Sequence, residues 1–310
     1  MSNFESEYDP KPLPDEVQPL AKWNVGLLTF FVLIQFLGGL GFGIAGLLAV
    51  APGFLFLFIL RNPIKKHVNL NRFIYIFFSI LPGIIIVVFQ QMGMSAFFDS
   101  LYDEDDINFG IHNLFYSLFT AFMVASFTEE VLKYFVIRRI DHTPEFTRTN
   151  IIGTSLLGFA GGLGFGIFEN ILYLSSAYAD GGVPMALLTG VMRAASAVPF
   201  HSVTGAIMGL GLGVRKHRLG GFATMGKIIA IPFVCHGIYN FLLFMILSIE
   251  YWFGEIAAGI YGLFALVFNI TLVALMCIWT KKKVYEYNEV YEQKKGISGR
   301  SSAFELNSSV

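Results

Sequence analysis

The chain has 310 residues, of which 55% are hydrophobic, and its mean hydropathy is +0.63. Only 14% of the residues are charged, against about 25% in soluble domains, so the composition excludes an ordinary soluble protein and indicates a membrane protein. The formal net charge is −1, and the basic residues concentrate in short segments between apolar stretches, so the sequence gives no indication of nucleic-acid binding.

The apolar stretches predict an all-α, polytopic membrane helix bundle. The first stretch, residues 25–60, would form a helix of about 54 Å, too long for one crossing of a bilayer core of about 30 Å. Because glycines cluster between Gly38 and Gly46, we expect two helices there and eight spans in all, with seven as the alternative. The other six expected spans are residues 73–94, 109–137, 151–178, 185–213, 223–249 and 256–279.

The charge distribution predicts the orientation of the bundle. Of the 21 lysines and arginines, 17 lie in four segments, residues 61–72, 138–148, 215–227 and 281–300. The alternate connections carry acidic residues and no basic ones. Under the positive-inside rule the basic segments are cytoplasmic, and eight spans then place both the N-terminus and the C-terminus in the cytoplasm.

The same pattern divides the chain into three parts. We expect a polar cytoplasmic tail at residues 1–22, a transmembrane domain at 23–280, and a cytoplasmic tail at 281–310 that is partly disordered from about Gly296. Residues 281–295 are expected to prolong the last helix. Residues 1–22 lack the basic region of a cleavable signal peptide, so the first span is expected to direct insertion.

Three charged residues lie within the expected span 109–137. Lys133 follows Glu129 by four residues and Glu130 by three, so it can contact both carboxylates from one helix face. A charge at the centre of a bilayer costs about 2.5 to 3.5 kcal/mol, and such residues usually have a function. Beside the lysine, one carboxylate can remain ionised and act as a base. The alternative is that Lys133 extends to the inner surface and the glutamates neutralise it.

Glu169 and Tyr173 form a second pair within a span. They are four residues apart and share a helix face with Gly162 and Gly166. Small residues allow transmembrane helices to approach closely, so we expect Glu169 to point into the protein.

Two histidines lie deep within the next two spans. His201 is in register with Gly205 and follows Pro199, which is expected to kink the helix. His236 and Asn240 are four residues apart on one face. Two histidines and three glutamates on four consecutive spans predict a shared hydrolytic site. Arg193 is expected to extend toward the outer surface.

These residues form four motifs that resemble those of the PrsW family of intramembrane proteases. The motifs are Glu-Glu-x-x-Lys at 129–133, Phe-Glu-x-x-x-Tyr at 168–173, His-x-x-x-Gly at 201–205 and His-x-x-x-Asn at 236–240. Their order and spacing match over about residues 109–247. The family is related to CAAX prenyl endopeptidases and bacteriocin-processing membrane proteases. One position differs from the family's pattern: the fourth motif often ends in Asp, and this chain has Asn240 there. An asparagine cannot serve as an anionic ligand or base.

The resemblance implies a multi-pass protein of the cytoplasmic membrane of a prokaryote that hydrolyses a peptide bond of a membrane-bound protein. A membrane-bound anti-sigma factor is the candidate substrate that it implies. The catalytic residues would be Glu129, Glu130, Lys133, Glu169, Tyr173, His201, His236 and Asn240.

Two mechanisms fit these residues. In one, Glu169, His201 and His236 bind a zinc ion while Glu130 acts as general base. In the other, no metal takes part: Glu130 activates water with the help of Glu129, and His201, His236 and Asn240 stabilise the oxyanion. The sequence has no His-Glu-x-x-His zinc motif, and the two mechanisms stay open.

Two other classes of function remain as alternatives. A proton-coupled transporter also places acids and histidines within glycine-rich membrane helices. Such a protein would usually show two related halves, whereas here the ionisable residues lie in consecutive spans. An inactive relative of the proteases, acting as a membrane scaffold, is the third possibility.

Overall fold

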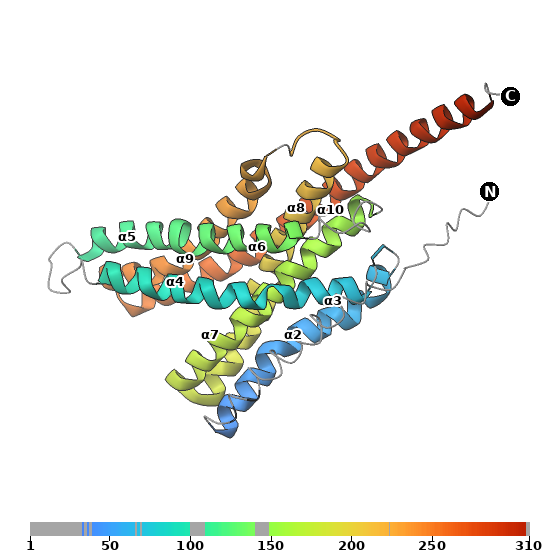
Figure 1. Ribbon diagram of the computed structural model, residues 1–310. Coiled ribbons are helices and arrows are strands. Elements are labelled where there is room, and N and C mark those ends of the chain that lie inside the picture. Colours follow the sequence, from blue (N-terminus) through green and yellow to red (C-terminus); the bar gives the residue numbers. More distant parts are fainter. Residues whose placement is uncertain are drawn as a thin grey trace.

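The computed structural model of the chain describes residues 33, 36, 39–65, 67–68, 70–99, 109–139, 149–222 and 224–307. These residues form a bundle of helices, and no strand occurs among them (Figure 1). The predicted all-α class is therefore confirmed. The expected N-terminal tail lies outside the described residues, and so does the first of the two helices expected within residues 25–60, apart from residues 33 and 36.

Helix α2 (Leu40–Lys65) follows a break at Gly39. Gly39 has φ +118°, a left-handed conformation that a glycine adopts without steric cost. The break therefore lies at the start of the glycine cluster, and the later glycines of that cluster belong to α2. The helix packs along α7.

The expected span 73–94 consists of two helices, α3 (Leu70–Ser79) and α4 (Leu81–Asp99). They are separated at Ile80, and Pro82 in the first turn of α4 has no N–H group to continue the helical hydrogen bonds. Residues Arg72–Met94 are long and apolar enough to cross a membrane.

The expected span 109–137 is continuous but not uniformly α-helical. It comprises α5 (Phe109–Phe119), a π-helical segment η2 (Thr120–Phe127) and α6 (Thr128–Arg138). The wider π turn ends two residues before Glu129. Because it changes the number of residues per turn, it alters which face of the helix the following side chains occupy, and such segments are frequent at functional sites.

Helices α7 (Ile151–Ala195) and α8 (Ala197–Lys216) form the centre of the bundle. The chain leaves helical geometry at Gly181 and Gly182, in the connection expected between two spans. It breaks again at Ser196, three residues before Pro199. The expected kink is therefore a break upstream of the proline, because Pro199 has no N–H group to bond to the carbonyl of residue 195.

Four glycines bring α7 and α8 into backbone contact. A Cβ atom at Gly162 would lie 1.9 Å from the carbonyl oxygen of His201, and one at Gly158 would lie 2.2 Å from that of Gly205. From the other side, Cβ atoms at Gly205 and Gly209 would each lie 2.3 Å from a carbonyl oxygen of α7. Only glycine allows this approach, which confirms the predicted close packing of this face.

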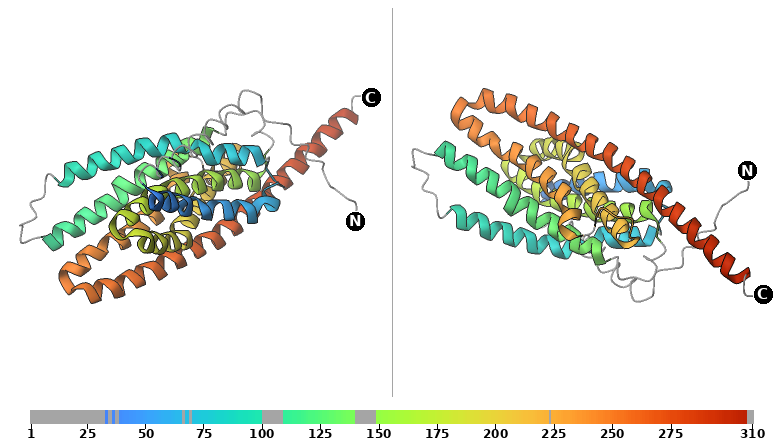
Figure 2. Two further views of the ribbon diagram at one scale, coloured as in Figure 1. Left: turned by 90° about the horizontal axis from the view of Figure 1, so that it is seen from below. Right: turned by 90° about the horizontal axis from the view of Figure 1, so that it is seen from above.

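Helices α9 (Met225–Phe253) and α10 (Glu255–Asn307) form an antiparallel pair that turns at Gly254, with φ +83°. Helix α10 continues past the expected span to Asn307, and its last part projects beyond the bundle (Figure 2). The expected prolongation of this helix is confirmed, and the stretch after Gly296 that was expected to be disordered is also helical in the structure.

Length and composition identify four stretches of the described chain that could cross a membrane: Arg72–Met94, Ile151–Lys216, Met225–Phe253 and Glu255–Gly296. The second stretch contains both α7 and α8, so it holds more than one crossing. The polytopic membrane architecture is thus confirmed, while the number of eight or seven spans stays a prediction.

Candidate active site

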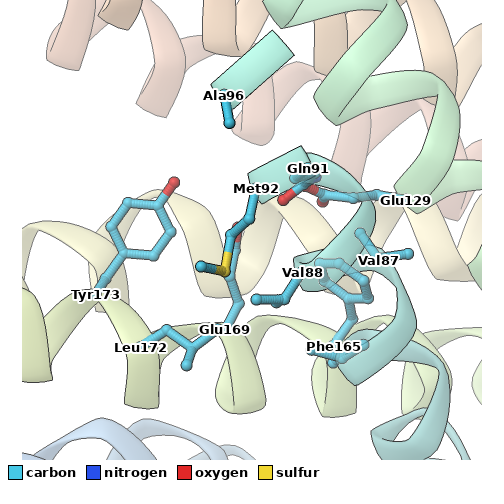
Figure 3. A pocket seen from close by; sticks show the side chains of 11 residues that line it. Val87, Val88, Gln91, Met92, Ala96, Glu129, Phe165, Glu169, Leu172 and Tyr173 are labelled. Atoms are coloured by element: carbon cyan, nitrogen blue, oxygen red, sulfur yellow. The ribbon is translucent and has the colours of Figure 1, made fainter. Parts of the chain in front are cut away.

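The ionisable residues of the four motifs converge where α4, α6, α7, α8 and α9 meet. A cavity of about 440 Å³ adjoins them between α4, α6 and α7 (Figure 3). Its polar lining consists of Gln91, Glu129, Glu169 and Tyr173, and the rest of its wall is mostly apolar.

Glu130 lies in the closed part of the cluster. Its side chain is fully buried, and Oε1 accepts a hydrogen bond of 2.6 Å from Lys133 Nζ. The same oxygen lies 2.7 Å from His236 Nδ1. Glu130 does not line the cavity. It therefore joins α6 to α9 and neutralises Lys133.

Lys133 joins α6 to α8. Its ammonium lies 2.8 Å from His201 Nδ1 and 4.4 Å from the centroid of the Phe165 ring, over the ring face. The side chain is fully buried. The alternative in which Lys133 extends to the membrane surface is therefore wrong. Its direct carboxylate partner is Glu130, rather than both glutamates.

Glu169 points into the protein, as predicted, and is paired with Arg193. Its Oε2 accepts a 2.5 Å bond from Arg193 Nη2 and lies 2.9 Å from His201 Nε2. The guanidinium also donates through Nε to Asn170 Oδ1, at 2.6 Å, and covers the Tyr173 ring at 3.8 Å from its centroid. The expectation that Arg193 extends toward the outer surface is therefore wrong, because the buried carboxylate binds it.

Glu129 is the carboxylate of α6 that faces the cavity. Its Oε1 accepts a 3.0 Å hydrogen bond from Gln91 Nε2 of α4 (Figure 3). Its Oε2 is buried and, like Oε2 of Glu130, has no hydrogen-bond partner among the described residues; it lies 3.7 Å from His236 Nε2. Since the direct partner of Glu129 is a neutral amide, its charge is balanced less directly than those of Glu130 and Glu169.

The hydrogen bonds assign the tautomers of the two imidazoles. The Lys133 ammonium is a donor only, so His201 Nδ1 accepts from it and Nε2–H donates to Glu169. For His236, Nδ1–H donates to Glu130, which leaves the Nε2 lone pair directed to the side of Glu129. The rings of the two histidines are 5.2 Å apart.

The remaining two predicted residues lie at the edge of this cluster. Tyr173 is 46% exposed and lines the cavity, with its hydroxyl directed away from α7 (Figure 3). Asn240 is half-buried, one turn beyond His236. Within the described part of the chain, no hydrogen bond links it to the cluster. Catalytic roles for both residues stay predictions.

Sequence reasoning missed three contributors to the site. Gln91 is a glutamine inside an otherwise apolar span, a signal that could have identified it. Asn170 is adjacent to Glu169, and Phe165 lies one helical turn before it. The contacts of Phe165 depend on the crossing of α7 with α6 and α8, and those of Asn170 on the return of α7 after Gly182 and on α2, neither of which their position in the sequence reveals.

Three potential metal ligands lie close together in the described residues. Glu129, His201 and His236 each offer one ligand atom, and these atoms lie within 4.8 Å of one another. The expected set contained Glu169 in place of Glu129. Glu169 is instead bound by Arg193, whereas Glu129 has a buried oxygen without a partner.

The donor chemistry of this group fits a divalent ion such as zinc. Glu129 Oε2 and His236 Nε2 both have free lone pairs, and His236 Nδ1–H is held by a carboxylate, as is usual for metal-binding histidines. His201 can serve as a ligand once it gives up one of its two hydrogen bonds.

Comparison with known proteins identifies the family. The family described as "PrsW family intramembrane metalloprotease" matches residues 72–276. A protein named "Protease PrsW" from Oceanobacillus iheyensis is 33% identical over 124 residues, which cover 40% of this chain and 54% of that relative. The match thus spans about half the length of the relative. No solved structure matches the chain. Because the family match covers about two thirds of its length, the chain belongs to the PrsW family of intramembrane metalloproteases.

Proposed function

We propose that this protein is an endopeptidase that hydrolyses a peptide bond of a membrane-bound protein. The observation that carries the proposal is Glu129: a carboxylate with a free buried oxygen, facing a cavity, beside two imidazoles. A carboxylate and two imidazoles supply the ligands or the proton acceptor that peptide hydrolysis requires. Membership of a metalloprotease family supports the same reaction.

The residues that would hold the metal ion are Glu129, His201 and His236. When bound, such an ion polarises the substrate carbonyl and makes water more acidic. The sequence favoured Glu130 as general base, but Glu130 is enclosed by Lys133 and His236. We propose that Glu129 takes the role of base in the mechanism without a metal, because it is the carboxylate of α6 that faces the cavity, and that it is a ligand rather than the base where a metal ion is held.

The other charged residues would position this centre. Glu130 holds the proton on His236 Nδ1 and so keeps Nε2 directed to the side of Glu129. Lys133 balances the charge of Glu130 and binds His201 Nδ1. Arg193 balances Glu169, which holds the His201 ring from its other side. His201 is thus oriented by groups on α6 and α7, and His236 by a carboxylate of α6.

The cavity supports a substrate that lies in the membrane. Its wall includes the exposed apolar side chains Met92 and Leu172, from helices α4 and α7. A hydrophobic peptide segment could therefore reach Glu129 between these helices without passing through water. We propose the cytoplasmic membrane of a prokaryote as the location and a membrane-bound anti-sigma factor as the candidate substrate.

The first test removes the carboxylate charge of Glu129. In proteoliposomes with a transmembrane substrate, Glu129→Gln should lower cleavage by about a thousandfold, because a positioned acid or base contributes about 10² to 10⁴ in rate. Glu289→Gln, on the exposed part of α10, is the control and should cleave normally. Unchanged cleavage by Glu129→Gln would contradict the assignment, and absence of cleavage by the unaltered protein would favour the scaffold or transporter alternatives.

The second test measures metal directly. The protein purified without added metal should contain about one zinc or other divalent ion per chain by elemental analysis, and a strong chelator should remove both the ion and the cleavage activity. Glu129→Gln and His236→Gln should each lower the metal content, whereas Glu289→Gln should retain it. Full activity without bound metal would instead support the mechanism in which Glu129 alone activates water.

A further inference from the structure

The structure has a second hollow, separate from the candidate active site. It has a volume of about 380 Å³ and lies between α2, α7, α8 and α10. We call it the α8–α10 groove, and its wall includes Phe56, Leu156, Phe159, Val203, Cys277 and Lys281. None of its lining residues is one of the defining residues of the four motifs, although Ser202 and Val203 follow His201 directly on α8.

The wall of the groove suits hydrocarbon rather than a polar ligand. Three aliphatic hydroxyl groups line it, and each donates its proton to a carbonyl of the protein: Ser155 to Ala206, Ser202 to Val198 and Thr280 to Met276. These serine and threonine hydroxyls therefore have no proton left for a ligand, and the remaining lining hydroxyl is the phenol of Tyr285, next to Lys281 at the charged end of the groove. The remaining wall is dominated by aliphatic and aromatic side chains.

One charged side chain lies in the wall. Lys281 is the first of three consecutive lysines in α10, and the other two are placed against Glu286, at 4.0 Å for Lys282 and 2.7 Å for Lys283. Lys281 has no ion-pair partner within the described residues. Its ammonium is therefore available to an anion at the groove.

The position of Lys281 along α10 matches the level of lipid headgroups. The helix is almost entirely apolar from Ile256 to Thr280 and strongly charged from Lys281 onward. Tyr285, one turn later, is half-exposed and also lines the groove. Lysine and tyrosine at the end of an apolar helix are typical of the membrane–water interface.

We propose that the α8–α10 groove binds one anionic glycerophospholipid, with an acyl chain along the apolar wall and the phosphate on Lys281. The groove supplies an apolar channel and, at its polar end, a cation that has no ion-pair partner in the described part of the chain, a combination found in basic lipid sites between transmembrane helices. This proposal is independent of the peptidase activity, because it requires none of the residues of the candidate active site.

The native cysteines provide the test. Cys277 is exposed and lines the groove, one turn before Lys281 on the same helix, whereas Cys235 lies in α9 and does not line it. In detergent, phosphatidylglycerol should slow maleimide labelling of Cys277 and leave Cys235 unaffected, as measured by mass spectrometry of the two peptides. Phosphatidylcholine and glycerol 3-phosphate, added at the same concentrations, should protect Cys277 much less.

Two matched variants test the role of the charge. Lys281→Gln should raise about fivefold the phosphatidylglycerol concentration needed to protect Cys277, because one lysine contributes about 1 kcal/mol to the binding of an anionic lipid. Lys282→Gln should leave this concentration unchanged. Equal protection by both phospholipids, or no effect of Lys281→Gln, would overturn the proposal. Protection of Cys277 by glycerol 3-phosphate alone would indicate a simple anion site. Protection that increases with protein concentration in the absence of lipid would indicate that a second copy of the chain covers the groove. Either outcome would also overturn the proposal.

Discussion

The two sides of the candidate active site are built differently. On one side, α7 and α8 touch through their backbones at four glycines, and they carry Glu169 and His201. On the other side, α4 faces α6 and α7 across a cavity of about 440 Å³. There, α4 contributes a single side-chain hydrogen bond to the ionisable cluster in the described residues, from Gln91 to Glu129.

This difference indicates a division of roles. Backbone contact through glycines allows almost no adjustment, because any shift would separate or overlap main-chain atoms. The α7–α8 side is therefore expected to hold Glu169 and His201 in constant positions. The α4 side can move by changing side-chain rotamers, which suits a wall past which a peptide must reach Glu129.

The largest effect is expected when the glycine contact is broken. In Gly162→Ala, the new methyl group would lie 1.9 Å from the backbone oxygen of His201, so the helices must separate. Overpacking costs about 1 to 3 kcal/mol, and more where backbone must move. We expect aggregation or a strongly lowered melting temperature, together with loss of cleavage.

The matched control for this variant is Gly259→Ala. A Cβ atom at Gly259, in α10, has no neighbour within 4 Å. This variant should melt at or slightly above the temperature of the unaltered protein, because alanine favours the helix by about 0.5 to 1 kcal/mol. If Gly162→Ala melted like Gly259→Ala, the α7–α8 contact would be looser than described.

A smaller but still large effect is expected at the buried ion pair of α7. Arg193→Met leaves Glu169 as an unpaired, largely buried carboxylate, and removal of one partner of such a pair costs about 3 to 5 kcal/mol. Thermal stability and cleavage should both fall. The double variant Arg193→Met with Glu169→Gln removes both charges and should recover part of the stability. Failure of the second change to restore any stability would argue against this pairing.

The smallest effect is expected on the α4 side. Gln91→Leu removes the hydrogen bond to Glu129 and should lower kcat about tenfold, because a hydrogen bond to a charged group contributes about 1.5 kcal/mol. The neighbouring Gln90→Leu is the control, since the Gln90 side chain is exposed and its amide contacts the sulfur of Met94 in its own helix. Equal kcat values for the two variants would exclude a positioning role for Gln91.

Much of the fold and the identity of the clustered residues could be predicted from the sequence. Long apolar runs indicated helices across a membrane, and charged groups within them had to face the interior, as Lys133 and Glu169 do. Glycines at helical spacing predicted the contact of α7 with α8. Each of these inferences rests on the cost of exposing polar groups to lipid, or on spacing along one helix.

The sequence was less informative about contacts between helices. Arg193 was expected at the surface because a lone arginine near a helix end usually extends outward, and its partner Glu169 lies on the preceding stretch of α7, across the Gly181–Gly182 turn. Helix breaks near prolines could be anticipated, but the π-helical segment before Glu129 could not.

The sequence by itself determined that this chain is a helical membrane protein with acids and histidines enclosed in its interior, because hydropathy and periodicity follow directly from the residues. Only the tertiary structure decided that Glu129 faces the cavity while its neighbour Glu130 is enclosed by Lys133 and His236. Two adjacent glutamates are alike in sequence, and their roles separate because Glu130 is held between Lys133 of its own helix and His236 of α9, whereas Glu129 faces the open space between α4 and α7.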